Sequence, residues 1–204
     1  MLEKFPHTFL PALMLVVAML VAGCGDSDSS GDGGPASSAN SIDRAFVAEM
    51  IPHHESAVEM AKIAQRRGSS EFVMQLADDI VRTQNAEIST MRAADRRLRS
   101  AGVAKGSLGV PEHMTGMDAD TSTLRTAKPF DRAFIRMMLP HHEGAIPMAK
   151  AEIAKGGDAA LKKLAQEIIT AQQREISMMR KQLGEAGAAG TDDADATHGT
   201  GHSG

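Results

Sequence analysis

The sequence predicts an all-α fold, a four-helix bundle made of two repeated helical hairpins. Apolar residues recur at intervals of three and four between residues 42 and 183, and this part of the sequence lacks the alternating pattern of a strand. The chain also repeats itself at an offset of 88 residues (131 − 43), from Asp43 to Asp131. We expect the two copies to pack against each other, because each has an apolar face to bury.

The repeat is clearest around a pair of histidines. Residues 50–55 read Met-Ile-Pro-His-His-Glu, and residues 138–143 read Met-Leu-Pro-His-His-Glu. The two copies span about residues 43–98 and 131–184, and residues 100–129 connect them. Each copy therefore predicts two helices that form one hairpin.

Helix ends can also be assigned from the sequence. Asp43 and Asp131 are expected to cap the first helix of each copy, and Gly68 and Gly156 are expected to end it. The proline before each histidine pair lies inside the first helix and is expected to kink it.

The N-terminus has the features of a bacterial lipoprotein signal peptide, residues 1–23. An apolar run from Phe9 to Ala22 follows Lys4, and it is shorter than the roughly 20 residues that a membrane-spanning helix needs. The run ends in Val-Ala-Gly-Cys24, which resembles a lipobox, and Cys24 is the only cysteine of the chain. We therefore expect Cys24 to carry the lipid that anchors the protein to the outer face of the cell membrane.

The mature chain is expected to contain one folded domain, residues 42–184, between two polar segments. Residues 24–41 are rich in Ser, Gly, Asp and Ala and predict a flexible tether, and residues 185–204 predict a disordered tail. Because the chain has neither Trp nor Tyr, it offers few surfaces on which bases stack, and we expect no nucleic-acid partner. The sequence indicates no particular protein partner.

Polar side chains occupy inward positions of the predicted bundle. In the first helix His53 lies on the apolar stripe, and in the second helix Gln84 and Glu87 stand where a bundle would place leucine. The second copy repeats this arrangement. Burial of these groups costs several kcal/mol unless each finds a partner. Two explanations are open: a hydrogen-bond network in which His53 donates to Glu87, or a bound metal ion.

Methionines recur beside these polar positions. Imidazole and thioether groups without thiolate suit copper, above all Cu(I), although another transition metal is also compatible with them. Some of the 14 methionines would simply fill core space, because only 3% of the residues are aromatic. The candidate metal ligands are His53, His54, Met50, Met60, Glu87 and Met91 in the first copy and His141, His142, Met138, Met148, Glu175 and Met179 in the second.

The doubled motif Met-x-x-His-His-Glu-x-Ala-x-x-Met-Ala, at residues 50–61 and 138–149, resembles the family called domain of unknown function 305. The resemblance covers nearly all of residues 42–183, and residues 113–117 (His-Met-x-x-Met) resemble the Met-rich connection of that family. It implies a ferritin-like four-helix bundle. Because some members are linked to copper binding and resistance outside the cytoplasm, it implies such a role here.

The first functional hypothesis is an extracytoplasmic lipoprotein that binds copper for storage or resistance, without being an enzyme. The second is a ferritin-like metal-dependent oxidoreductase. Its usual Glu-x-x-His motif is missing, because Met50 and Met138 stand three residues before His53 and His141. The third is a metal-free helical module that binds another envelope protein.

Changing Cys24 to Ser should release the protein from the membrane fraction or stall its processing, because the lipid supplies the attachment. Fractionation of cells that express the variant measures this directly, with Ser30→Ala as the control that stays on the membrane. A Cys24→Ser variant that is processed and remains membrane-bound would contradict the lipobox interpretation.

Overall fold

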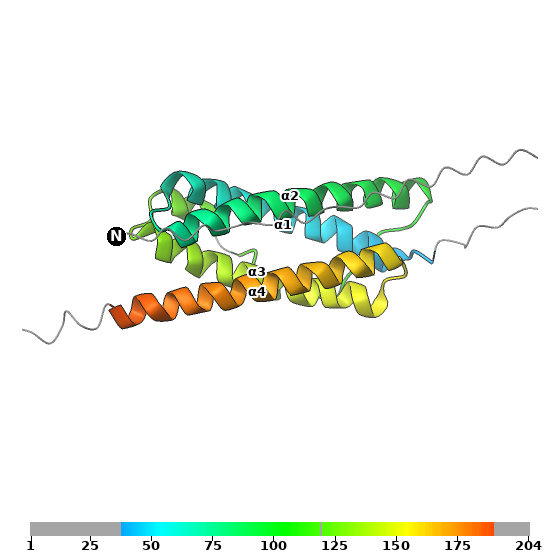
Figure 1. Ribbon diagram of the computed structural model, residues 1–204. Coiled ribbons are helices and arrows are strands. Elements are labelled where there is room, and N and C mark those ends of the chain that lie inside the picture. The colour runs from blue at the N-terminus through cyan, green and yellow to red at the C-terminus, as the bar shows by residue number, and fades with distance from the viewer. Residues whose placement is uncertain (1–37, 119, 190–204) are drawn as a thin grey trace, which may run out of the picture. The chain divides into compact units, whose positions relative to one another are not determined.

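The computed structural model describes residues 38–118 and 120–189, and the described residues form helices and connecting loops without strands. The elements in chain order are α1 (Ser41–Arg67), α2 (Glu71–Ser100), the short 3-10 helices η1 (Glu112–Met114) and η2 (Thr121–Arg125), α3 (Phe130–Lys155) and α4 (Ala159–Ala189). Helices α1 and α2 form one hairpin, and α3 and α4 form the other (Figure 1). The predicted all-α fold of two repeated hairpins is confirmed.

Several predicted segments fall outside this description. The signal peptide, Cys24, most of the tether and residues 190–204 of the tail are not among the described residues. Helix α4 extends past the domain boundary that the sequence predicts at residue 184 and ends at Ala189. None of the helices in the described ranges is long and apolar enough to cross a membrane.

The first helices end as predicted but begin differently. Gly68 and Gly156 follow the last residues of α1 and α3. The cap of α1 is Asn40 rather than Asp43, because the Asn40 side chain accepts the N–H groups of Ile42 and Asp43. The Asp43 carboxylate accepts the Asn40 N–H in return, which completes a capping box. In α3, Pro129 precedes the helix and supplies no side-chain cap.

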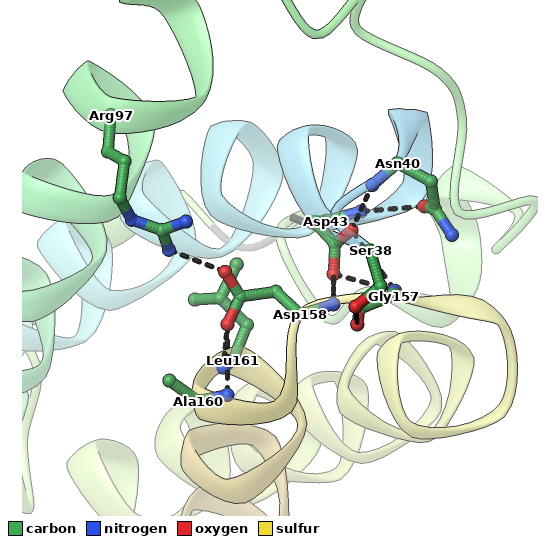
Figure 2. Close-up of polar contacts among 8 residues, drawn as sticks. All are labelled: Ser38, Asn40, Asp43, Arg97, Gly157, Asp158, Ala160 and Leu161. Carbon is green, nitrogen blue, oxygen red and sulfur yellow. Dashed lines mark hydrogen bonds and ion pairs between the residues drawn. The ribbon is translucent and has the colours of Figure 1, made fainter. Parts of the chain in front are cut away.

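Each of the two aspartates instead joins one hairpin to the other. The Asp43 carboxylate accepts the N–H groups of Gly157 and Asp158 in the turn between α3 and α4, at 2.9 and 2.8 Å (Figure 2). The Asp131 carboxylate accepts the N–H groups of Ser69 and Ser70 in the turn between α1 and α2, at 3.0 and 2.7 Å. The internal repeat thus becomes an approximate two-fold symmetry, in which each copy holds the turn of its counterpart.

The core consists of two apolar clusters, one towards each end of the bundle. The first cluster joins the N-terminal halves of α1 and α4 to the C-terminal halves of α2 and α3, and the second joins the opposite halves. Helices α1 and α3 are therefore antiparallel neighbours. Phe46 in the first cluster and Phe134 in the second are fully buried, and burial of each such side chain contributes about 1.5–3 kcal/mol.

The connection between the copies is fastened to the bundle near both of its ends. Gly102 has a φ of 72° and reverses the chain after α2, so that the Val103 carbonyl accepts an N–H of Arg44 at 2.6 Å. Near its other end, an Arg67 N–H donates to the Ala127 carbonyl at 3.1 Å. Leu124 in η2, which is part of this connection, is fully buried in the second apolar cluster. The connection is consequently held against the helices, and between these two points the Thr115 carbonyl contacts His53 near the middle of α1.

The two inter-hairpin aspartates should differ in their contribution to stability. Asp43→Ala should lower the free energy of unfolding by about 1–3 kcal/mol, because Asp43 is fully buried and its loss leaves buried N–H donors without an acceptor. Asp131→Ala should cost less, because water reaches exposed Ser69. Denaturant unfolding of both variants measures the difference, and an equal or larger loss for Asp131→Ala would contradict this account.

Candidate metal site

Four histidines lie in the middle of the bundle, between the two apolar clusters. His53 and His54 come from α1, and His141 and His142 come from α3; at most 1% of each residue is exposed. Gln84 of α2 and Gln172 of α4 are also buried. We call the set His53, His54, Gln84, Glu87, His141, His142, Gln172 and Glu175 the polar layer.

His53 and His141 meet across the interface between the two copies. Their ring centroids are 3.9 Å apart, and the rings are tilted by 41°. Within each pair the rings diverge, because the centroids of His53 and His54 are 6.1 Å apart and those of His141 and His142 are 6.3 Å apart. The first histidine of each motif therefore faces the other copy.

The second histidine of each motif pairs with a carboxylate of its own hairpin. The Nε2 of His54 lies 2.8 Å from the Glu87 carboxylate, and the Nε2 of His142 lies 2.6 Å from the Glu175 carboxylate. The predicted pair of His53 with Glu87 is therefore wrong. Successive residues of a helix point about 100° apart. In α1 this turns His53 towards α3 and His54 towards α2.

Unused nitrogen lone pairs remain in the polar layer. The Nε2–H of His54 and that of His142 donate to carboxylates, and the Nδ1 atom of each ring is buried without a hydrogen-bond partner. His53 Nε2–H donates to the Thr115 carbonyl at 3.0 Å, which leaves its Nδ1 without a partner. Neither ring nitrogen of His141 has a partner. Buried polar atoms of this kind are costly unless something binds to them.

The histidines that face each other are held neutral. The pKa of His53 is lowered to about 3, mainly by burial. The neighbouring His54 also lowers this pKa, and its effect is larger than the opposite effect of the hydrogen bond between His53 and Thr115. Burial holds the pKa of His141 well below its usual range. The second cause is repulsion by the positive charge that a protonated His53 would carry. At neutral pH both imidazoles therefore keep a lone pair for a metal ion.

The six candidate methionines are buried on both sides of the polar layer. Met50, Met91 and Met148 belong to one apolar cluster, and Met60, Met138 and Met179 belong to the other. A surface cavity of about 350 Å³ reaches from the connection to His53 and is lined by Met117, Thr115 and Met148, among others. The structure thus brings one buried thioether, that of Met148, to the same cavity as His53.

A close backbone contact holds the connection over this region. A Cβ on Gly144 would lie 1.9 Å from the Thr115 carbonyl oxygen, so only glycine fits there, whereas the first copy has Ser56 at the equivalent position. Gly116 has a φ of 69°, and a Cβ there would lie 2.3 Å from the Pro140 carbonyl oxygen and 2.7 Å from His141 Cα. In the sequence, the one indication of this contact is Gly144, which stands where the first copy has serine.

The remaining polar residues of the motif point outwards. Glu55 forms an exposed ion pair with Arg92, and Glu143 forms the equivalent pair with Arg180. In residues 38–118 and 120–189, no three His, Cys, Asp or Glu side chains form a group that could hold a metal ion. The carboxylates that reach the polar layer, Glu87 and Glu175, are each engaged by a histidine.

These features define a class of duplicated helical-hairpin proteins with a buried, metal-compatible histidine layer. Residues 43–183 match the family described as Domain of unknown function (DUF305), and the chain belongs to this family.

Solved structures share the fold. CopM in its Cu(I)-bound form is 30% identical with a TM-score of 0.59, over 70% of this chain and 96% of CopM. CopM has also been solved with Cu(II), with silver and in the apo form. A DUF305 fragment from Deinococcus radiodurans is 30% identical with a TM-score of 0.60, over 72% of this chain and 98% of the fragment. A DUF305 protein from Streptomyces coelicolor, described as a candidate for secretion, is 30% identical with a TM-score of 0.62, over 72% and 94% of the two chains.

A shorter similarity links the chain to a viral protein. The uncharacterized protein L153 of Acanthamoeba polyphaga mimivirus is 40% identical over 55 residues, which are 27% of this chain and 36% of that protein. The match therefore spans about a third of this curated relative.

Glu87→Ala should lower the free energy of unfolding by about 1–3 kcal/mol, because it leaves the buried Nε2–H of His54 without an acceptor. The matched control is Glu55→Ala, which removes an exposed ion pair and should cost less than about 1 kcal/mol. Denaturant titrations of the two variants provide the comparison. Equal losses would mean that the carboxylate of Glu87 has no structural role in the polar layer.

Proposed function

We propose that this chain is an extracytoplasmic lipoprotein that binds copper in the polar layer, for storage or resistance. The observation that carries the proposal is the contact between His53 and His141, whose buried ring centroids are 3.9 Å apart and whose ring nitrogens include three without partners. On each neutral ring one of these nitrogens has a lone pair for a metal ion. A metal ion held by nitrogens of both rings would compensate for their burial and would join the two copies.

The surrounding residues favour a soft metal ion. Methionines lie on both sides of the polar layer, and Met148 shares a cavity with His53. Imidazole and thioether ligands together select copper over iron or manganese. The copper-bound and silver-bound structures of CopM, a protein of the same fold, support this choice.

His54 and His142, which donate to carboxylates, would either help to position the other two histidines or bind the metal ion themselves. In metal sites, a carboxylate that accepts one ring N–H fixes the tautomer and turns the other nitrogen towards the metal. Glu87 and Glu175 engage His54 and His142 in this way. Each copy would therefore contribute one histidine that faces its counterpart and one whose orientation a glutamate fixes.

The export signal and Cys24 support a location outside the cytoplasm. The apolar run before Cys24 is typical of a lipoprotein signal peptide, and a lipid on Cys24 would attach the domain to the membrane. The Streptomyces coelicolor relative, described as a candidate for secretion, agrees with export. Copper binding at the outer face of the membrane would keep the ion away from the cytoplasm.

Competition dialysis of the mature chain against equal concentrations of copper, zinc, iron(II) and manganese(II) should leave copper bound. The double variant His53→Ala, His141→Ala should lose most of the bound copper while its helical circular dichroism survives. His113→Ala, which changes an exposed histidine of the connection, is the matched control and should retain copper.

Other outcomes of this dialysis would select the competing hypotheses. Undiminished copper in the double variant would contradict the proposed site. Tight binding of two irons with consumption of oxygen would favour the ferritin-like oxidoreductase. A folded chain that retains no metal would favour a module that binds another envelope protein.

A further inference from the structure

A buried carboxyl at one end of the bundle has no role in the polar layer. Glu152 lies in the last turns of α3 and is fully buried, and neither of its carboxyl oxygens meets a donor. Gly156 makes room for it, because a Cβ at position 156 would lie 2.2 Å from Glu152 Oε1. An ionised carboxylate in this position would be costly.

The Asp43 carboxyl group lies within hydrogen-bonding reach of the Glu152 carboxyl group. Asp43 already accepts three backbone N–H groups, from Asn40, Gly157 and Asp158 (Figure 2). Burial acts to raise its pKa, but these hydrogen bonds and one from Glu152 outweigh burial and lower it. Because Asp43 stays ionised and can only accept, the contact between the two carboxyls requires a proton on Glu152.

We propose that Glu152 and Asp43 share one bound proton at neutral pH, and that loss of this proton loosens the joint between α1 and the turn from α3 to α4. The joint also holds the segment before α1, since the Ser38 hydroxyl donates to the Gly157 carbonyl and the Asn40 side chain donates to the Lys155 carbonyl. A second negative charge beside Asp43 would repel the carboxylate that accepts from the turn.

The charges around Glu152 are consistent with a proton held near neutral pH. Burial raises the pKa of Glu152 to about 8, and the hydrogen bond to Asp43 and the negative charges of Asp43 and Asp158 act in the same direction. Lys162 of α4 opposes them. A further nearby cation, Arg97 of α2, forms an ion pair with Asp158 at 2.5 Å.

The opposite end of the bundle provides an internal comparison. There Asp131 accepts from Ser69 and Ser70 as Asp43 accepts from Gly157 and Asp158, but the residue equivalent to Glu152 is Ala64. The joint at Asp131 therefore lacks a second carboxyl and should not respond to pH in the same range.

Amide hydrogen exchange of the mature chain, corrected for the intrinsic effect of pH on exchange, tests the proposal. The pKa of Glu152 is about 8 when the joint is closed and near 4.5 when it is open. At any pH between these two values, opening of the joint therefore releases a proton from Glu152. Protection of the Gly157 and Asp158 amides should fall about tenfold per pH unit in this range and level off above it. The Ser69 and Ser70 amides should show no such slope.

Glu152→Gln keeps a donor for Asp43 but cannot ionise, so the slope at Gly157 and Asp158 should disappear and the infrared band of a protonated carboxyl should be lost. Glu152→Ala, which copies Ala64, should also abolish the slope, and both variants should bind copper as the parent chain does. A parent chain without the slope, an equal slope at Ser69 and Ser70, or a slope that persists in Glu152→Gln would overturn the proposal.

Discussion

The contact between the His53 and His141 rings in the middle of the core constrains the rest of the fold. For these side chains to meet, α1 and α3 must pack against each other near their midpoints. The two apolar clusters on either side of the contact show that the helices run in opposite directions. The outer helices α2 and α4 then supply Glu87 and Glu175 to the second histidine of each pair. Such a layer also fixes the register of the helices, since a shift by one turn would place the imidazoles among apolar side chains.

The two copies are equivalent in sequence motif but differ in their surroundings. The Thr115 carbonyl of the connection accepts a hydrogen bond from His53, whereas the described part of the connection makes no equivalent bond to His141. Gly144 allows this asymmetry by letting the connection approach α3. At one end of the bundle Glu152 adds a buried carboxyl that the other end lacks. Duplication thus accounts for the scaffold, whereas the connection and single residues that differ between the copies distinguish its two halves.

The sequence predicted what depends on periodicity and repetition, namely the two hairpins, the inward histidines and the glycines that end α1 and α3. It misassigned the partner of Glu87, because adjacent histidines face different helices and only packing decides which one meets α2. The sequence predicted Asp43 only as a helix cap, although its carboxylate also accepts the N–H of Gly157, which lies more than 100 residues away in the chain. It missed Glu152, because an acidic residue near a helix end normally lies in solvent and the repeat has alanine there.

Copper-edge X-ray absorption of the Cu(I)-loaded mature chain tests the copper site most directly, because it identifies the atoms bound to the metal. If copper binds between the two copies, its ligands should be imidazole nitrogen together with thioether sulfur. His53→Ala, His141→Ala should retain little copper, and the copper that remains should show less nitrogen coordination than in the parent chain. A first shell of oxygen alone, or an unchanged spectrum in that double variant, would contradict it.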